Sequence, residues 1–172
     1  KEAVWNSSDM RVKVSLPYTP QSEERGKEGH ITIHSLNSLG ILTVVPSGRY
    51  NAATGMVSFT GILSGTYSIT FTEKTFRDIG KFEWARNAIE VLGSKGIING
   101  MTEDQFVPQA EVKRGDFVLL LIKAFGLEGD SAESFTDVQP GDYRYEALAM
   151  AKQLGITTGR PDGSFDPNAS VT

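Results

Sequence analysis

The sequence contains no cysteine, which excludes disulfide bonds, thiolate zinc sites and cysteine nucleophiles. It also has no long hydrophobic run. The longest, from Phe117 to Ile122, has six residues, whereas a membrane-spanning helix needs about 20. We therefore expect no transmembrane segment. Because Lys1 to Met10 lack the apolar stretch of a signal peptide, we interpret the chain as a fragment of a secreted protein.

Clustered positive charge is missing as well. Residues 1–72 carry six Lys/Arg and five Asp/Glu, and residues 73–172 carry eleven and sixteen, which together give the net charge of −4. Nucleic-acid binding normally requires a positive stripe that displaces counterions from phosphates, so we expect no nucleic-acid partner. No motif combines a nucleophile, a base and an oxyanion hole. The sequence predicts a non-catalytic protein without a cofactor.

Two patterns resemble metal sites only in part. His30 and His34 have the spacing of a helical metal pair, but they lie in an alternating run typical of a strand, and we interpret both as exposed strand histidines. The loop from Asp162 to Asp166 lacks the series of acids and the terminal Glu of a hand-type calcium loop. We predict no metal site.

The sequence has two halves with different hydrophobic periods, which predicts an α+β fold. Residues 1–72 contain short β-branched or aromatic runs, separated by Pro, Gly and Asn, at 11–16, 30–34, 40–45, 56–60 and 67–71. We expect about five antiparallel strands, forming a small all-β module or the end of a larger β domain.

The second half has the helical period. We expect helices at about 83–95, 114–125 and 143–154, ended by Gly96, Gly126 and Gly155. The middle helix is almost entirely apolar and should be buried. The other two should bury one stripe each: Trp84, Ala85, Ala88, Ile89 and Leu92 in the first, and Ala147, Leu148, Ala151 and Leu154 in the third.

An internal duplication organises this second half. Sliding it by 59 residues gives ten identities in the 38 positions from Phe76 to Lys113, without a gap. The identities include glycines, a proline and aromatic residues, which fix turns and cores. We therefore expect both copies to form a helix, a Gly-x-x-x-Gly turn, a short extended Phe-x-Pro segment and a second helix.

Both copies resemble the S-layer homology repeat, whose elements are Phe-x-Asp, His-Trp-Ala, Gly-x-x-x-Gly, Phe-x-Pro and Thr-Arg-Ala-Glu. The first copy has Phe76-x-Asp78, Trp84-Ala85, Gly96-x-x-x-Gly100, Phe106-x-Pro108 and Lys113-Arg-Gly-Asp116. The second has Phe135-x-Asp137, Tyr143 in place of Trp, Gly155-x-x-x-Gly159 and Phe165-x-Pro167. The resemblance covers about 97 of the 172 residues. It suggests three segments: a β module at 1–72, repeat 1 at 73–130 and repeat 2 at 131–172. The β half resembles the segment that often precedes such repeats in surface proteins.

The resemblance implies an extracellular, non-catalytic anchoring module of a Gram-positive-type cell wall. Family members with three repeats form a pseudo-threefold bundle and bind secondary cell-wall polysaccharide, often pyruvylated. The implied partner is this polysaccharide or another peptidoglycan-linked polymer. Residue 172 aligns with Lys113, so the second copy stops before its second helix. We expect either self-association through a helix recruited from another molecule or a mobile second copy.

A binding site for an acidic sugar is predicted at the start of the second helix. There, free backbone N–H groups and the helix dipole would meet Arg114 and Lys113. Binding is favoured over a structural role for Arg114, whereas the two roles are balanced for Lys113. Arg160 is a further candidate cation. Asp116 is expected to complete a capping box at this helix start.

The remaining candidates each have a structural alternative. Trp84 and Tyr143 either stack on a sugar or pack in a core. Asp78 and Asp137 either accept sugar hydroxyls or serve as N-cap or turn residues, with the structural role slightly favoured. Gly100 and Gly159 either let a ligand approach the backbone or supply a positive φ in a turn.

Two rival functions remain open. The repeats and the β module could serve protein assembly in a surface layer. Alternatively, the chain could be an accessory module of an extracellular polysaccharide-degrading enzyme whose catalytic domain lies outside it.

Overall fold

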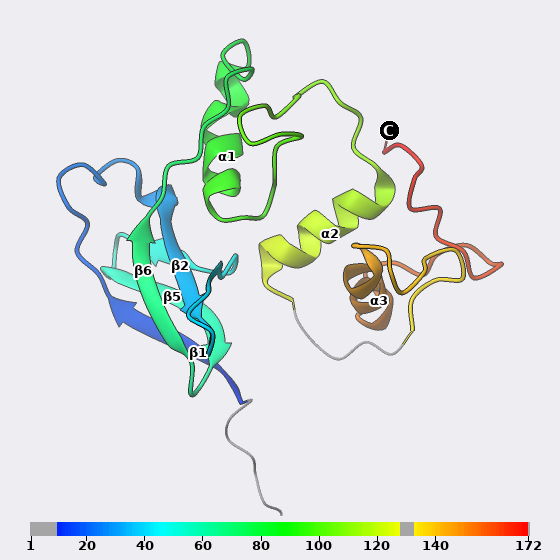
Figure 1. Cartoon of the computed structure of the whole chain (residues 1–172), viewed down its shortest axis with the longest axis horizontal. Coiled ribbons are helices and arrows are strands. Elements are labelled where there is room, and N and C mark those ends of the chain that lie inside the picture. Colours follow the sequence, from blue (N-terminus) through cyan, green and yellow to red (C-terminus); the bar gives the residue numbers. More distant parts are fainter. Residues whose placement is uncertain (1–9, 128–132, 172) are drawn as a thin grey trace, which may run out of the picture. The chain divides into compact units, whose positions relative to one another are not determined.

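The computed structural model describes residues 10–127 and 133–171 and divides into two compact units. The N-terminal unit extends to Val107 and contains the β module and the first helix. The C-terminal unit starts at Pro108 and contains the other two helices. The mixture of antiparallel sheets and helices confirms the predicted α+β class (Figure 1).

The β module consists of two three-stranded antiparallel sheets. One has the order β1-β5-β4, built from β1 (Arg11–Pro17), β5 (Met56–Ile62) and β4 (Arg49–Asn51). The other has the order β3-β2-β6, built from β3 (Leu42–Val44), β2 (Ile31–Leu36) and β6 (Thr66–Phe71). The five predicted runs all form strands. The three-residue β4 was not predicted, because so short a segment shows no alternation.

The two sheets share one hydrophobic core. Ile31 and Ile33 of β2 and Val57 and Phe59 of β5 are almost completely buried in it. These residues alternate along their strands, so each strand turns one face to the core. On β2 the opposite face is buried as well, because Thr32 is 1% exposed, so the alternation did not separate a buried from an exposed face there.

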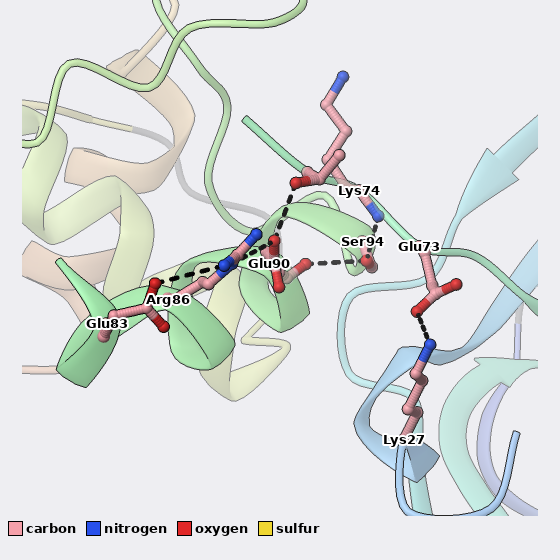
Figure 2. A network of polar contacts seen from close by, with 8 residues as sticks. Lys27, Glu73, Lys74, Glu83, Arg86, Glu90 and Ser94 are labelled. Atoms are coloured by element: carbon pink, nitrogen blue, oxygen red, sulfur yellow. Dashed lines mark hydrogen bonds and ion pairs between the residues drawn. The ribbon is translucent and has the colours of Figure 1, made fainter. Parts of the chain in front are cut away.

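Helix α1 (Glu83–Ser94) is joined to the β module by buried polar contacts. The hydroxyl of Ser94 lies 2.9 Å from Nδ1 of His30, accepts from the backbone N–H of Lys74 at 3.0 Å and donates to the carbonyl of Glu90 at 2.8 Å. Figure 2 shows Ser94 at the end of α1 next to Lys74, whose neighbour Glu73 forms an ion pair with Lys27.

The prediction of exposed strand histidines was wrong for His30. This residue ends the short 3-10 helix η2 (Glu28–His30) and is 5% exposed. Its imidazole is buried because Ser94 supplies a hydrogen-bond partner from a distant part of the sequence. His34 is half-buried on β2, with its Nδ1 2.9 Å from the hydroxyl of Thr70.

The C-terminal unit packs α2 (Arg114–Phe125) against α3 (Tyr145–Gln153), as Figure 1 shows. Val118 and Ile122 of α2 face a core that also contains Phe135, Leu148 and Phe165. All three helices lie within a few residues of their predicted bounds. None of the helices in the described ranges is long and apolar enough to cross a membrane.

Three expectations about helix burial were wrong. Helix α2 is not buried all round, because it packs through one face only, and Phe117 and Phe125 remain 45% and 71% exposed. On α1, Ile89 is buried, but Trp84 is 88% exposed and Ala88 is also exposed. Leu154 is 52% exposed because it lies just beyond the last residue of α3.

Candidate functional site

An aspartate clamps the Phe-x-Pro loop in both repeats. In repeat 1, the carboxylate of Asp78 accepts hydrogen bonds from the backbone amides of Phe106, at 2.9 Å, and Val107, at 2.7 Å. In repeat 2, Asp137 does the same for Phe165, at 2.8 Å, and Asp166, at 2.7 Å. The structure thus places both aspartates in turns within their own repeats. Neither is a helix N-cap.

These contacts alter the acidity of both carboxyl groups. The amide of Phe106 is the main reason why the pKa of Asp78 lies below its ordinary value. For Asp137, burial raises the pKa, but the amides of Phe165 and Asp166 outweigh this effect, and the pKa is lowered. Both side chains are therefore held in the charged form.

The second glycine of each Gly-x-x-x-Gly turn is needed for close packing. A Cβ on Gly100 would lie 2.4 Å from the carbonyl oxygen of Gln105 and 2.7 Å from the ring of Phe76. A Cβ on Gly159 would lie 2.6 Å from the ring of Phe135. Of the two, only Gly159 has a positive φ, of 72°. The close approach is to the repeat's own aromatic core.

The start of α2 is tied to the loop of repeat 2. The backbone N–H of Arg114 donates to the carbonyl of Ala169 at 2.7 Å, and that of Gly115 donates to the carbonyl of Pro167 at 2.9 Å. These two groups are therefore already occupied, and the predicted cluster of free N–H donors is wrong for them. Lys113 at the N-cap makes no side-chain cap hydrogen bond.

A cavity of about 360 Å³ opens beside this helix start. Its polar lining comes from Arg114, Arg160, Thr157 and Ser170. The apolar lining comes from Phe117, Val118, Phe165, Ala169 and Val171. A hollow with two guanidinium groups and an apolar wall suits a small anion attached to a partly apolar framework.

The two arginines of the cavity differ in their partners. The guanidinium of Arg114 lies 4.4 Å from the ring centroid of Phe165, in a cation–π contact. Within the described ranges, no carboxylate pairs with it. Arg160 donates to Asp166 at 2.7 Å. The structure therefore brings two predicted residues together and leaves the charge of Arg114 available to a ligand.

The other predicted residues lie outside the lining of this cavity. The Nζ of Lys113 lies 3.4 Å from the hydroxyl of Ser170 and 3.9 Å from Glu111. Trp84 lies on the first turn of α1 in the N-terminal unit, where its high exposure leaves the ring accessible. Tyr143, 70% exposed, precedes α3, and its hydroxyl donates to Asp116.

Asp116 does not complete the predicted capping box, since its carboxylate accepts from Tyr143 of the second repeat. Being shorter than the Glu of the family pattern, it meets a partner on a neighbouring element. The same hydrogen bond raises the pKa of Tyr143 above its ordinary value.

The sequence analysis missed Arg144 and its partner Asp142. Arg144 is only 6% exposed and forms a fork with Asp142, with Nε to Oδ1 at 2.9 Å and Nη2 to Oδ2 at 2.7 Å. This contact lowers the pKa of Asp142 to about 2. The duplication could not reveal the pair, because repeat 1 has Glu83 and Ala85 at these positions.

Comparison with protein families identifies the duplicated segment. The model of the S-layer homology domain matches residues 75–118 and 134–172. The two matches contain the duplicated segments 76–113 and 135–172. No solved structure matches the chain.

Curated relatives include enzymes and surface-layer proteins. The chain is 34% identical to an amylopullulanase of Thermoanaerobacterium thermosulfurigenes over 73% of its length and 7% of the enzyme's. It is 36% identical to exoglucanase XynX of Acetivibrio thermocellus, in an alignment that covers the whole of this chain and 15% of the length of the enzyme. It is 28% identical to an S-layer protein of Bacillus licheniformis over 84% of its length and 18% of that protein's.

The chain therefore spans less than a fifth of each of these relatives. The exoglucanase alignment includes the β module as well as the repeats. The family match and the S-layer relatives assign the chain to the bacterial cell surface and its wall. Through its two repeats, at 75–118 and 134–172, the chain belongs to the S-layer homology family.

Proposed function

We propose that the chain anchors its parent protein non-covalently to a secondary cell-wall polysaccharide that carries acidic groups, such as pyruvate ketals. The observation that carries this proposal is the cavity beside α2, which joins Arg114 and Arg160 to an apolar wall. Membership of a family of surface modules supports it.

The chemistry of the cavity fits a ketal-bearing sugar. A ketal carboxylate is a planar anion that accepts two parallel hydrogen bonds from one guanidinium group. Arg114 is the better candidate for this contact, because Arg160 already pairs with Asp166. The hydroxyl of Thr157 supplies hydrogen bonds for sugar hydroxyls, and that of Ser170, which donates to Glu111, offers an acceptor. Phe117 and Val171 supply apolar contact with the ring.

The other candidates divide into two groups. We assign sugar stacking to the exposed rings of Trp84 and Tyr143 and an accessory positive charge to Lys113. We assign Asp78, Asp137, Gly100 and Gly159 to the construction of the repeats. Their contacts are with backbone amides, carbonyl oxygens and core rings of the chain itself.

Co-sedimentation with purified wall sacculi tests the proposal, using sacculi with and without their secondary polymer. We expect binding that is lost when the polymer is removed and weakened at least tenfold by Arg114→Ala. Arg25→Ala removes an equal charge from an exposed loop of the β module and serves as the control. Equal binding to stripped and intact sacculi would contradict the proposal.

Assembly with other copies is the second candidate function. The aromatic ring of Phe125 is 71% exposed on α2, and several relatives are S-layer proteins. Sedimentation velocity over a range of concentrations distinguishes the two functions. Association without sugar, abolished by Phe125→Ser, would favour assembly or helix exchange over anchoring.

Any enzymatic activity of the parent protein would reside outside these repeats.

A further inference from the structure

Arg144 is a buried cation that the anchoring chemistry does not use. It lies at the N-cap of α3, with 6% of its surface exposed. Its guanidinium is held from one side by the fork with Asp142 and lies 3.8 Å from Asp116 of α2. Two carboxylates from two different elements thus fix the position of one planar group.

The opposite edge of the guanidinium contacts residues 165–170, which carry the cavity-lining residues Phe165, Ala169 and Ser170 and are called the wall below. Nη1 donates to the carbonyl of Pro167 at 3.3 Å and to the side-chain oxygen of Asn168 at 3.1 Å. Pro167 and Asn168 stand between Phe165 and Ala169, which both line the cavity. Arg144 itself does not line it. Arg144 therefore contacts the wall without itself lining the cavity.

The same carbonyl connects the wall to the start of α2. The oxygen of Pro167 accepts from both Arg144 and the backbone N–H of Gly115, which follows Arg114 directly. The backbone N–H of Arg114 in turn donates to Ala169. Arg144 consequently holds the wall at the point where the wall bonds to the backbone of Arg114 and Gly115.

The contacts of Arg144 with Pro167 and Asn168, which we term the brace, have no counterpart in repeat 1. The residue of repeat 1 that aligns with Arg144 is Ala85, whose side chain ends at Cβ. Space for the larger side chain comes from Gly115, since a Cβ there would lie 3.0 Å from Cδ of Arg144 and 2.9 Å from Cβ of Pro167. The side chain of Arg144 thus occupies space that is available because residue 115 is a glycine.

We propose that Arg144 is a positioning residue, which sets the affinity of the cavity by holding the 165–170 wall against the start of α2. This inference rests on the proposed polymer-binding function. Without the brace, the wall loses the side-chain contacts with Arg144, and its backbone hydrogen bonds with Arg114 and Gly115 open more often. The cavity then adopts a wider range of conformations, and ligand binding must select the one that fits the ligand, which lowers the affinity.

Three variants of the whole chain test this role. Arg144→Ala removes the brace, and Arg144→Lys keeps the charge but loses the planar fork. Asn168→Ala removes one contact from the wall side and leaves the pairs with Asp142 and Asp116 in place, which keeps the test informative if the arginine variants fold poorly. The control is Gln109→Ala, because Gln109 is exposed and occupies the position of repeat 1 that aligns with Asn168.

The first readout is affinity for the polymer, measured at a temperature at which every variant is fully folded. We expect about a tenfold weaker affinity for Arg144→Ala and a smaller loss for Arg144→Lys and Asn168→Ala. Gln109→Ala should bind like the parent chain. In an Arg114→Ala background, Arg144→Ala should have little further effect, because the cavity that it positions no longer holds the anion. Unchanged affinity in folded Arg144→Ala and Asn168→Ala would overturn the proposal.

The second readout does not require a ligand. Amide hydrogen exchange should accelerate for Arg114 and Gly115 in Arg144→Ala, whereas the amide of Leu127, bonded to Ile122 at the far end of α2, should keep its protection. Faster exchange without any polymer binding by the parent chain would refute the anchoring function but support the brace. Uniform acceleration along the whole of α2 would show a general structural role and would refute the positioning role.

Discussion

Asp137 accepts a hydrogen bond from the backbone amide of Phe165, 28 residues further along the chain, at 2.8 Å. Repeat 1 contains the same relationship between Asp78 and Phe106, with the same separation and a distance of 2.9 Å. In both cases the next residue, Val107 or Asp166, has a positive φ of about 60°. A non-glycine residue adopts this conformation at a cost, which the clamp helps to offset.

Asp137→Asn should loosen the loop of repeat 2. One of the two accepting oxygens becomes an amide donor, which faces a backbone N–H instead of accepting from it. We expect the amides of Phe165 and Asp166 to exchange at least tenfold faster. Glu103→Gln, an exposed residue of the loop in repeat 1, serves as the control for the change of charge. Unchanged exchange in Asp137→Asn would show that the loop conformation does not depend on the clamp.

The clamps should also weaken in acid. Because the pKa of both Asp78 and Asp137 is lowered in the folded protein, their contribution is fully present above the ordinary pKa of about 4. The contribution should be lost as the pH falls through the lowered values. Exchange of the Val107 and Asp166 amides, compared at equal intrinsic rate between pH 5 and pH 2, measures this loss. Protection that stays constant over this range would contradict the prediction.

Gly100→Ala should destabilise the N-terminal unit. The added methyl group would meet two carbonyl oxygens of the following loop, at 2.4 and 2.5 Å, and these cannot move away as a flexible side chain would. We expect a loss of about 2 kcal/mol in the free energy of unfolding. Gly80→Ala is the matched control, because nothing lies within 4 Å of its added Cβ and its φ is not positive. Urea denaturation of both variants provides the comparison, and equal losses would contradict the packing role.

The sequence predicted much of the fold because its signals were local or duplicated. Alternating runs predicted where the strands lie, and the apolar run closed by Gly126 predicted the bounds of α2 from Arg114 to Phe125. The duplication also located Asp78 and Asp137 in equivalent places, although it could not show that both hold backbone amides.

The features that escaped prediction depend on contacts between distant segments. His30 is buried because Ser94 reaches it from α1, 64 residues later. The carboxylate of Asp116 accepts a hydrogen bond from Tyr143 and not from the backbone of its own helix. Arg144 aligns with Ala85 of repeat 1, so the internal comparison, which located pairs such as Asp78 and Asp137, contained no signal for it.

The stability of the N-terminal unit should increase in mild alkali because of Lys95. This lysine is 6% exposed, and its Nζ donates to the carbonyls of Ile31, at 3.1 Å, and Gly48, at 2.9 Å. Burial, aided by the positive charge of Arg49, lowers its pKa from 10.5 to about 8. Between these two values the unfolded chain binds more protons than the folded one, so the free energy of unfolding rises with pH.

Urea denaturation at pH 7.5 and pH 10 measures this effect. We expect the parent chain to gain roughly 2 kcal/mol over this interval relative to Lys95→Met, which cannot titrate at this position. The comparison cancels the titration of other groups, which both proteins share. An equal response of the two proteins would show that Lys95 remains charged in the folded state over this range.

Trp84→Ala separates a binding role of the aromatic ring from a packing role. The indole is 88% exposed on the first turn of α1, so its removal should change the free energy of unfolding by less than about 0.5 kcal/mol. If the ring stacks on a sugar, affinity for the wall polymer should fall about tenfold. Leu39→Ala, at a residue that is 82% exposed in the β module, is the matched control for loss of exposed apolar surface. A large loss of stability would assign Trp84 to packing, and full retention of affinity would remove it from the binding site.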